Sequence, residues 1–158
     1  MFRELARKKK QISTDECICL LRNEKRGVLS VLGDDDYPYG MPMNHFYNDD
    51  DGCLYFHCGK AGHRLDSLKS HEKVSYCVYD KGYCGKDEWA LNIKSVIVFG
   101  KTKIIYDTDK IIDITAKLSH KFTQDEEYIN EEIKKYAHNT LLIQLVPEHI
   151  CGKLVTES

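Results

Sequence analysis

Long apolar runs are missing from this 158-residue sequence, and their absence argues against a membrane-spanning helix. The longest apolar stretches, such as "SVIVF" (95–99) and "LLIQLV" (141–146), are far short of the roughly 20 residues that a spanning helix needs. The basic start, "MFRELARKKKQ", has no apolar segment behind it, so we expect no signal peptide. An excess of positive charge is missing too. The net charge is −2, so nothing in the overall charge favours a nucleic-acid partner.

Paired cysteines are also missing. The sequence has seven cysteines, an odd number, and no CxxC motif. A secreted disulfide framework normally has an even number of cysteines and a signal peptide. We therefore expect a cytoplasmic protein with reduced thiols at Cys17, Cys19, Cys53, Cys58, Cys77, Cys84 and Cys151.

Hydrophobic periodicity divides the chain into strands and helices within a single domain, 1–158. Ser13 precedes Glu16 by three residues, the spacing of a capping box at the start of a helix. The sequence "NDDDG" (48–52) is typical of a hairpin turn. We predict helices at 13–25, 63–71, 107–122 and 125–138, and strands at 27–32, 39–47, 53–58, 73–80, 95–107 and 139–155.

These six β segments are joined mainly by hairpins, and the helices lie between or beside them. The first three strands should form an antiparallel meander, and Gly100 should mark a bend or bulge in the fifth. This order favours a mainly β fold of the α+β class, a small antiparallel barrel with peripheral helices, over a doubly wound parallel sheet.

The stretch "LYFHCGKAGHRLDSL" (54–68) contains residues that suggest three kinds of site. A zinc site is disfavoured because Cys53, Cys58 and His63 lack the close pairs that structural zinc prefers. A nucleophilic Cys58 assisted by His57 is disfavoured because adjacent residues on a strand face opposite sides. We expect no metal, and we expect Cys58 to be a buried thiol.

A phosphate site is the third reading of this stretch. Gly59 and Gly62 permit a sharp turn or a close approach of the backbone. His63 and Arg64 then fall in the first helical turn, where free N–H groups and the helix dipole favour an anion. The Arg64 guanidinium suits two phosphate oxygens. Spacing alone leaves open a plain strand-to-helix turn with solvated basic residues, because neither common phosphate-loop motif is present.

Beyond these patterns, the sequence resembles a known family. The segments "RGVLSVL", "YPYGMPMNHFY", "DGCLYFHCGKAGHRLDSLKSHEKVSYCV" and "SVIVFGK" are similar to pyridoxamine 5′-phosphate oxidase-related flavoproteins. Within that superfamily they most resemble the nitroimidazole-resistance (NimA-like) branch. The resemblance implies a six-stranded antiparallel split β-barrel of Greek-key type that binds FMN at the interface of a homodimer.

The resemblance also implies roles for individual residues. The backbone of the strand "MPMNHF" would run along the flavin ring, a second strand would continue the wall, and a basic pair would take the phosphate. His57 would be the catalytic proton donor near the flavin edge. The implied cofactor-binding residues are Pro42, Met43, Asn44, Phe56, His57, Cys58, His63, Arg64 and Ser95.

The function implied is that of an FMN-dependent oxidoreductase, which reduces a small electron-poor molecule such as a nitro compound. FAD is an alternative cofactor, because a phosphate clamp and a ring wall would serve either nucleotide in an open pocket. The C-terminal "PEHICGKLVTES" lacks the arginine-bearing segment that holds the substrate in pyridoxamine phosphate oxidases, so vitamin B6 oxidation is not expected. The alternative class is a flavin- or haem-binding protein without turnover, acting in storage or sensing.

Overall fold

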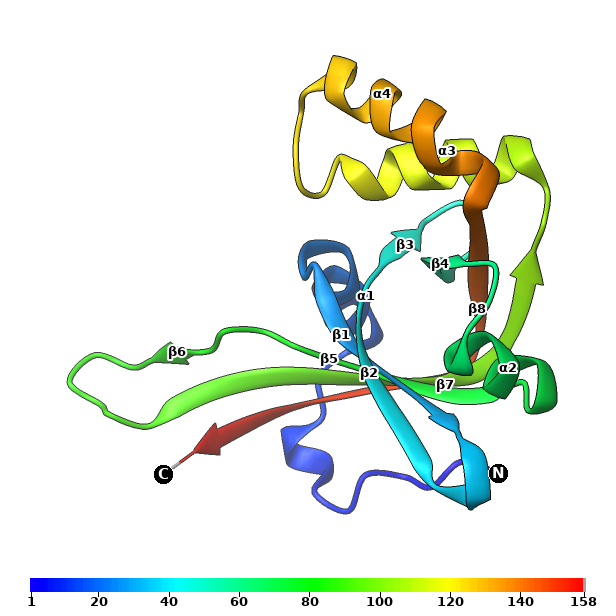
Figure 1. Cartoon of the computed structure of the whole chain (residues 1–158). Coiled ribbons are helices and arrows are strands. Elements are labelled where there is room, and N and C mark those ends of the chain that lie inside the picture. The colour runs from blue at the N-terminus through cyan, green and yellow to red at the C-terminus, as the bar shows by residue number, and fades with distance from the viewer. Residues whose placement is uncertain (158) are drawn as a thin grey trace.

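The computed structural model describes residues 1–157, and its centre is one strongly curved antiparallel sheet (Figure 1). The helices are α1 (Thr14–Asn23), α2 (His63–Ser70), α3 (Thr108–Ser119) and α4 (Glu126–Tyr136), with 3₁₀ turns at Lys8–Lys10, Asp34–Asp36 and Ala137–Asn139. The strands are β1 (Arg26–Leu32), β2 (Pro38–Asn44), β3 (Phe46–Asn48), β4 (Cys53–Gly59), β5 (Lys73–Tyr79), β6 (Tyr83–Cys84), β7 (Leu91–Ile105) and β8 (Thr140–Glu157).

The sheet has the order β2-β1-β5-β7-β8-β4-β3, and β6 pairs with β7. Every pairing between these strands is antiparallel, from the hairpin of β1 and β2 to the long ladder of β7 and β8. Because β2 and β3 follow each other in the chain, the two ends of this order are joined and the sheet curls back on itself. The predicted antiparallel split β-barrel with peripheral helices is therefore confirmed.

The strand count differs from the prediction because the expected strand 39–47 is two strands, broken at His45. The first part, β2, pairs with β1, and the second part, β3, pairs with β4. The His45 side chain is fully buried at the break, and its backbone N–H donates to the carbonyl of Lys25. This one segment thus runs from one edge of the sheet to the other.

Two further differences lie along β7, which begins at Leu91 rather than at residue 95. Its added length pairs with the two-residue strand β6, in a region predicted to be a loop. The predicted irregularity at Gly100 is confirmed, since the register of β7 against β8 shifts between Phe99 and Gly100. Glycine is needed there because a Cβ atom would collide with the carbonyl oxygen of Val146.

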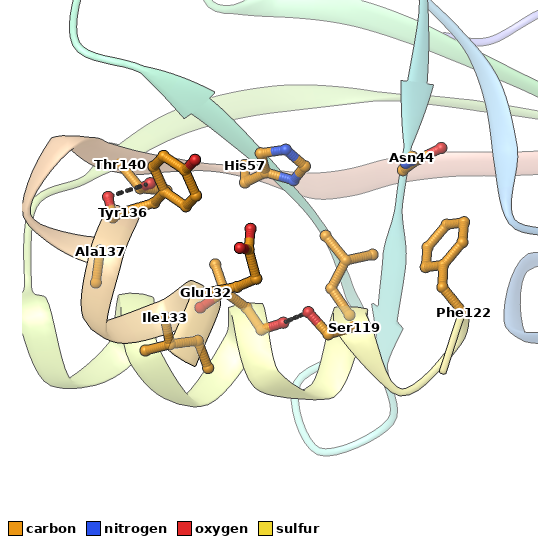
Figure 2. Close-up of a pocket in the computed structure, with 11 residues that line it drawn as sticks. Asn44, His57, Ser119, Phe122, Glu132, Ile133, Tyr136, Ala137 and Thr140 are labelled. Atoms are coloured by element: carbon orange, nitrogen blue, oxygen red, sulfur yellow. Dashed lines mark hydrogen bonds between the residues drawn. The ribbon is translucent and has the colours of Figure 1, made fainter. Parts of the chain in front are cut away.

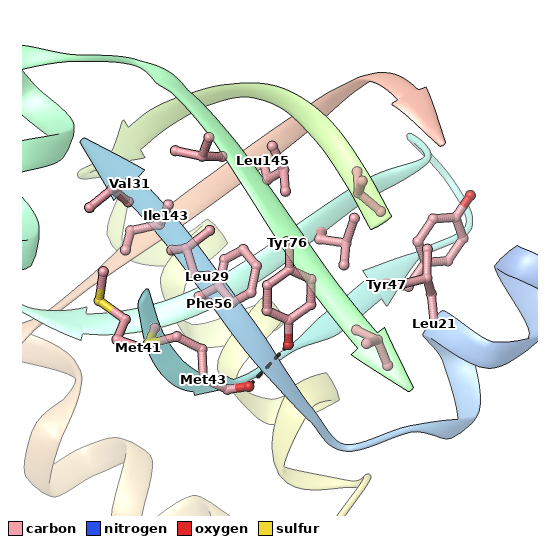
Figure 3. Packing of buried hydrophobic residues seen from close by; sticks show 14 of the residues in the cluster. Leu21, Leu29, Val31, Met41, Met43, Tyr47, Phe56, Tyr76, Ile143 and Leu145 are labelled. Atoms are coloured by element: carbon pink, nitrogen blue, oxygen red, sulfur yellow. Dashed lines mark hydrogen bonds between the residues drawn. The ribbon is translucent and has the colours of Figure 1, made fainter. Parts of the chain in front are cut away.

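The larger core cluster fills the barrel (Figure 3). Its side chains alternate along the strands, so that Met41 and Met43 of β2 point inward between outward-facing neighbours. The helix α1 adds Leu20 and Leu21 to this cluster. Its predicted capping box is present, with the Ser13 hydroxyl accepting from the backbone N–H of Glu16.

A smaller core cluster lies on the other face of β4 and β8, beneath α3 and α4. It contains Cys53 and Tyr55 of β4, Leu142 of β8, and Ile111 and Ile114 of α3. Successive β4 side chains therefore enter two different interiors, as the period of a strand dictates. No helix among residues 1–157 combines the length and the apolar character needed to cross a membrane.

Candidate functional site

A cleft opens between β2, at one end of the sheet order, and β4, the strand next to the other end, and these two strands are not paired within residues 1–157. It consists of two adjoining hollows of about 370 and 250 Å³. Both hollows are lined by Pro42, Met43, Cys58, Gly59 and Arg64, and we call the combined space the cleft. It lies at the mouth of α2.

The cleft gathers seven of the nine residues that the sequence suggested for a cofactor, namely Pro42, Met43, Asn44, His57, Cys58, His63 and Arg64. The other two lie elsewhere. Phe56 is fully buried in the barrel core, with its ring 4.8 Å from that of Tyr76 in an edge-to-face arrangement. Ser95 is on β7 opposite Tyr79 and Lys153, separated from β2 by two strands.

Two arginines give the cleft its positive charge. Arg64 contacts the sulfur of Met43 across the cleft, and no carboxylate in residues 1–157 lies within ion-pair distance of its guanidinium. Arg26 lines the same space and donates from Nε to Oδ1 of Asn44 over 2.9 Å. Arg26 was not among the predicted site residues, although the register of the predicted hairpin, which sets it opposite Asn44, could have indicated it.

The loop from Gly59 to Gly62 leaves open space at the start of α2. No heavy atom lies within 4 Å of a Cβ built on either glycine, and Gly62 has φ = +121°, which disfavours other residues. No side chain in the described part of the chain caps this helix start. An unfilled cradle of this kind beside a helix N-terminus is suited to an anion.

The His63 ring is already engaged on the outer side of the cleft. It stacks on Tyr39 with centroids 4.4 Å apart, and its Nε2 lies 3.5 Å from a carboxylate oxygen of Asp34. Arg64, rather than the His63 ring, therefore supplies the free cationic group of this helix start.

A buried hydrogen-bond network supports the end of β2. The His45 Nε2 lies 2.7 Å from the carbonyl oxygen of Leu21, to which it donates. Its Nδ1 lies 2.8 Å from the Tyr76 hydroxyl, which is also 3.0 Å from the carbonyl oxygen of Met43 (Figure 3). Burial, with the nearby charge of Lys121, lowers the His45 pKa to about 3, so this ring is neutral at pH 7. The network thereby fixes the backbone that lines the cleft.

His57 occupies the boundary between the cleft and a second pocket. This pocket, which we call the helix pocket, lies between the sheet and the α3–α4 pair and has a volume of about 210 Å³ (Figure 2). Asn44 and His57 line both spaces. The remaining residues around it are Thr115, Leu118, Ser119, Phe122, Glu132, Ile133, Tyr136, Ala137 and Thr140. Sequence reasoning missed this pocket, which arises only when the two helices pack on β4 and β8.

The His57 ring is accessible to solvent, yet its pKa is lowered. The larger cause is the displacement of water by surrounding protein atoms, and the smaller is the charge of Arg64. We expect the Arg64→Ala variant to move the His57 pKa part of the way back towards 6.5, as measured by NMR titration of the imidazole. Arg26→Ala is the matched control, because Arg26 does not contribute to this shift. An unchanged His57 pKa in Arg64→Ala would show that the two side chains are not coupled.

The geometry supports neither a zinc site nor a nucleophilic Cys58 assisted by His57. Within residues 1–157, no three His, Cys, Asp or Glu side chains come together in a way that could hold a metal ion. Cys58 belongs to the barrel core cluster, whereas His57 faces the helix pocket, so the two do not form a pair. Burial raises the pKa of the Cys58 thiol despite the charge of Arg64, which keeps it protonated.

Comparison with known proteins decides the family. The family model described as pyridoxamine 5′-phosphate oxidase matches residues 13–154, nearly the whole chain. The chain belongs to the pyridoxamine 5′-phosphate oxidase family. The matched range includes every residue of the cleft and of the helix pocket. No curated protein matches the sequence.

Solved structures share the fold of this family member at low sequence identity. One, named "putative 5-nitroimidazole antibiotic resistance protein", is from Bacteroides thetaiotaomicron; it has a TM-score of 0.78 and 16% identity, over 92% of this chain and 87% of that one. An FAD-binding protein from Mesorhizobium loti has a TM-score of 0.65 and 19% identity, over 92% and 97%. A flavocytochrome from Azotobacter vinelandii has a TM-score of 0.73 and 16% identity, over 91% and 68%.

Proposed function

We propose that the cleft binds a flavin nucleotide, FMN in preference to FAD, and that the protein is a flavin-dependent oxidoreductase. The observation that carries this proposal is Arg64, a guanidinium that has no carboxylate partner within residues 1–157 and lies beside the open loop at the start of α2. Family membership and flavin-binding neighbours of the same fold support it.

The residues of the cleft fit such a nucleotide. Arg64 and the N-terminus of α2 would hold the phosphate, through charge-assisted hydrogen bonds and free N–H groups. Pro42 and Asn44, which point away from the barrel core, would contact the flavin ring. The cleft has room for it, since pockets for ligands of this size typically measure about 300–1,000 Å³.

The proposed reaction is the reduction of a small electron-poor molecule such as a nitro compound. The bound flavin would supply two electrons, obtained from an external reductant. Reduction of a nitro group to a nitroso group consumes two electrons and two protons and releases water. Neutral His57 carries one ring N–H, which it can donate to an oxygen of the acceptor. The neighbour named for 5-nitroimidazole resistance supports this choice of acceptor.

The visible spectrum of the purified protein tests the cofactor. We expect bands near about 370 and 450 nm, typical of oxidised flavin, and release of FMN on denaturation. A Soret band would support a haem-binding protein instead, and a colourless protein that fails to bind added FMN would contradict the proposal. Turnover of a nitro compound with a reductant then tests catalysis, because a flavin carrier without turnover would show the bands alone.

We also propose a homodimer in the cytoplasm. The hairpin of β6 and β7 extends beyond the barrel together with the end of β8 (Figure 1). Two exposed aromatic side chains belong to this hairpin, and a third lies at the end of β5. Tyr79, Tyr83 and Trp89 are 61%, 54% and 79% exposed, and such residues favour an interface when they cluster. The cytoplasmic location is supported by the seven free thiols.

Light scattering tests the dimer. We expect twice the chain mass for the wild type. The Tyr83→Asp, Trp89→Asp double variant should have a dimer dissociation constant at least about tenfold higher, since buried interface aromatics commonly contribute that much binding energy. Tyr128→Asp, at an exposed position of α4, is the matched control. A stable wild-type monomer that retains flavin would contradict the dimer.

A further inference from the structure

The helix pocket borders the cleft at two side chains, and it differs from the cleft in charge. Asn44 and His57 line both spaces, so a molecule in the helix pocket lies beside whatever the cleft holds. The cleft contains Arg26 and Arg64, whereas no lysine or arginine is among the described residues that line the helix pocket. Glu132 is the only carboxylate among its lining residues.

The apolar part of the pocket suits a ring. Leu118 of α3 contributes to its walls, as do Phe122, which follows α3, and Ile133 of α4. Figure 2 shows the side chains of Phe122 and Ile133 around this space. Its volume is about 210 Å³, and an apolar cavity of about 150 Å³ already accommodates benzene. A single substituted aromatic or heteroaromatic ring therefore fits.

Around the helices, three of the lining hydroxyls can accept hydrogen bonds but have already used their protons, which leaves the phenol of Tyr136 as the remaining hydroxyl donor among the described residues. The hydroxyls of Thr115, Ser119 and Thr140 donate to the carbonyl oxygens of Ile111, Thr115 and Tyr136, over 2.7, 2.8 and 2.9 Å. Figure 2 shows the carboxylate of Glu132 directed from α4 into the space below His57. The Glu132 side chain makes no hydrogen bond or ion pair within residues 1–157. A protonated nitrogen is the ligand group that such a wall selects.

On the sheet side, the polar groups can donate. Oδ1 of Asn44 accepts from Arg26, and its amide N–H₂ donates to no group within residues 1–157. The neutral His57 ring carries one N–H. No hydrogen bond within residues 1–157 involves the His57 ring. The oxygens of a nitro or carbonyl group match these donors.

We propose that the helix pocket is the acceptor site and that it takes a single aromatic or heteroaromatic ring with an oxygen-bearing electron-poor group and a protonated amine. The oxygen-bearing group faces Asn44 and His57, and the amine pairs with Glu132. This inference rests on the proposed function, because it assigns the substrate class of the flavin site.

Three ring compounds of matched shape test the proposal by calorimetric titration into the purified protein. 4-Nitrobenzylamine is cationic at pH 7, 4-nitrobenzyl alcohol is neutral and 4-nitrobenzoate is anionic. We expect the amine to bind about tenfold more tightly than the alcohol, and the benzoate more weakly than either. Equal binding of the amine and the alcohol, or a preference for the benzoate, would overturn the proposal.

Two substitutions in α4 test whether Glu132 is the group that prefers the amine over the alcohol. In Glu132→Gln, we expect the amine to lose its tenfold advantage over the alcohol, while the neighbouring Glu131→Gln keeps it. An advantage retained in Glu132→Gln would overturn the assignment. If Glu132→Gln does not fold, NMR of the wild type decides, since the amine should shift the His57 ring resonances and an unshifted ring would place the ligand elsewhere.

The flavin content of the same samples separates this inference from the proposed function. Flavin bands without any preference for the amine would overturn the acceptor site and leave the cofactor proposal standing. An amine preference lost in Glu132→Gln, in a protein that binds no flavin, would instead support the pocket and contradict the cofactor proposal.

Discussion

Replacement of Arg64 by alanine is expected to weaken FMN binding by about 30- to 1000-fold, which corresponds to roughly 2–4 kcal/mol. The guanidinium lines the cleft, has no ion-pair partner within residues 1–157, and lies beside the open glycine loop. If it binds the phosphate, its removal leaves the anion with the free N–H groups of α2 and the charge of Arg26 in the same cleft. Flavin titrations at one fixed ionic strength would measure the change, with circular dichroism to verify the fold.

Riboflavin is the decisive comparison, because it lacks the phosphate and should lose far less affinity in the same variant. Arg64→Lys should recover part of the loss, since the charge returns without the bidentate fork. Lys69→Ala removes a charge from the last turn of α2 and should change FMN affinity by less than about threefold. Equal losses for FMN and riboflavin in Arg64→Ala would place the phosphate elsewhere.

Replacement of Phe56 by alanine is expected to lower the free energy of unfolding by about 3–5 kcal/mol, the usual cost of deleting a buried aromatic ring. Phe56 is fully buried and packs edge-to-face on Tyr76 in the barrel core. Phe56→Leu keeps much of the volume and should cost less than about 1.5 kcal/mol. Urea unfolding monitored by circular dichroism would measure both.

The same two variants test whether Phe56 contacts the flavin, as the family resemblance implied. The structure places the ring in the core, so Phe56→Leu should bind FMN with wild-type affinity. A large loss of FMN affinity in Phe56→Leu, without a loss of stability, would show that Phe56 does contact the flavin.

The helices and most of the strands were predictable because each depends on a local pattern. The capping box at Ser13, the turn at 48–52 and the irregularity at Gly100 all lie where the sequence placed them. The break at His45 was not predictable, because 39–47 reads as one continuous strand. What breaks it is a set of contacts from distant parts of the chain, made by Leu21, Lys25 and Tyr76.

The cleft was more accessible to sequence reasoning than the helix pocket. Gly59, Gly62 and Arg64 lie close together in the sequence, in a pattern that indicates a phosphate site. The family resemblance indicated that the strand "MPMNHF" would face them. Nothing local marks Glu132, which is one of several acidic residues in a charged helix. Its placement depends on how α3 and α4 pack on β4, a tertiary relation that no single segment records.

The alternation of β4 has a consequence for how this molecule could change over evolution. The cleft is lined by β1, β2, β4 and the start of α2, whereas the helix pocket takes most of its lining from α3 and α4. Substitutions on the inner faces of those two helices can therefore reshape one chamber without disturbing the other. Under selection for a new small molecule, variation should accumulate in α3 and α4 first. A directed-evolution library confined to 115–137 would sample that variation while leaving the residues of the cleft unaltered.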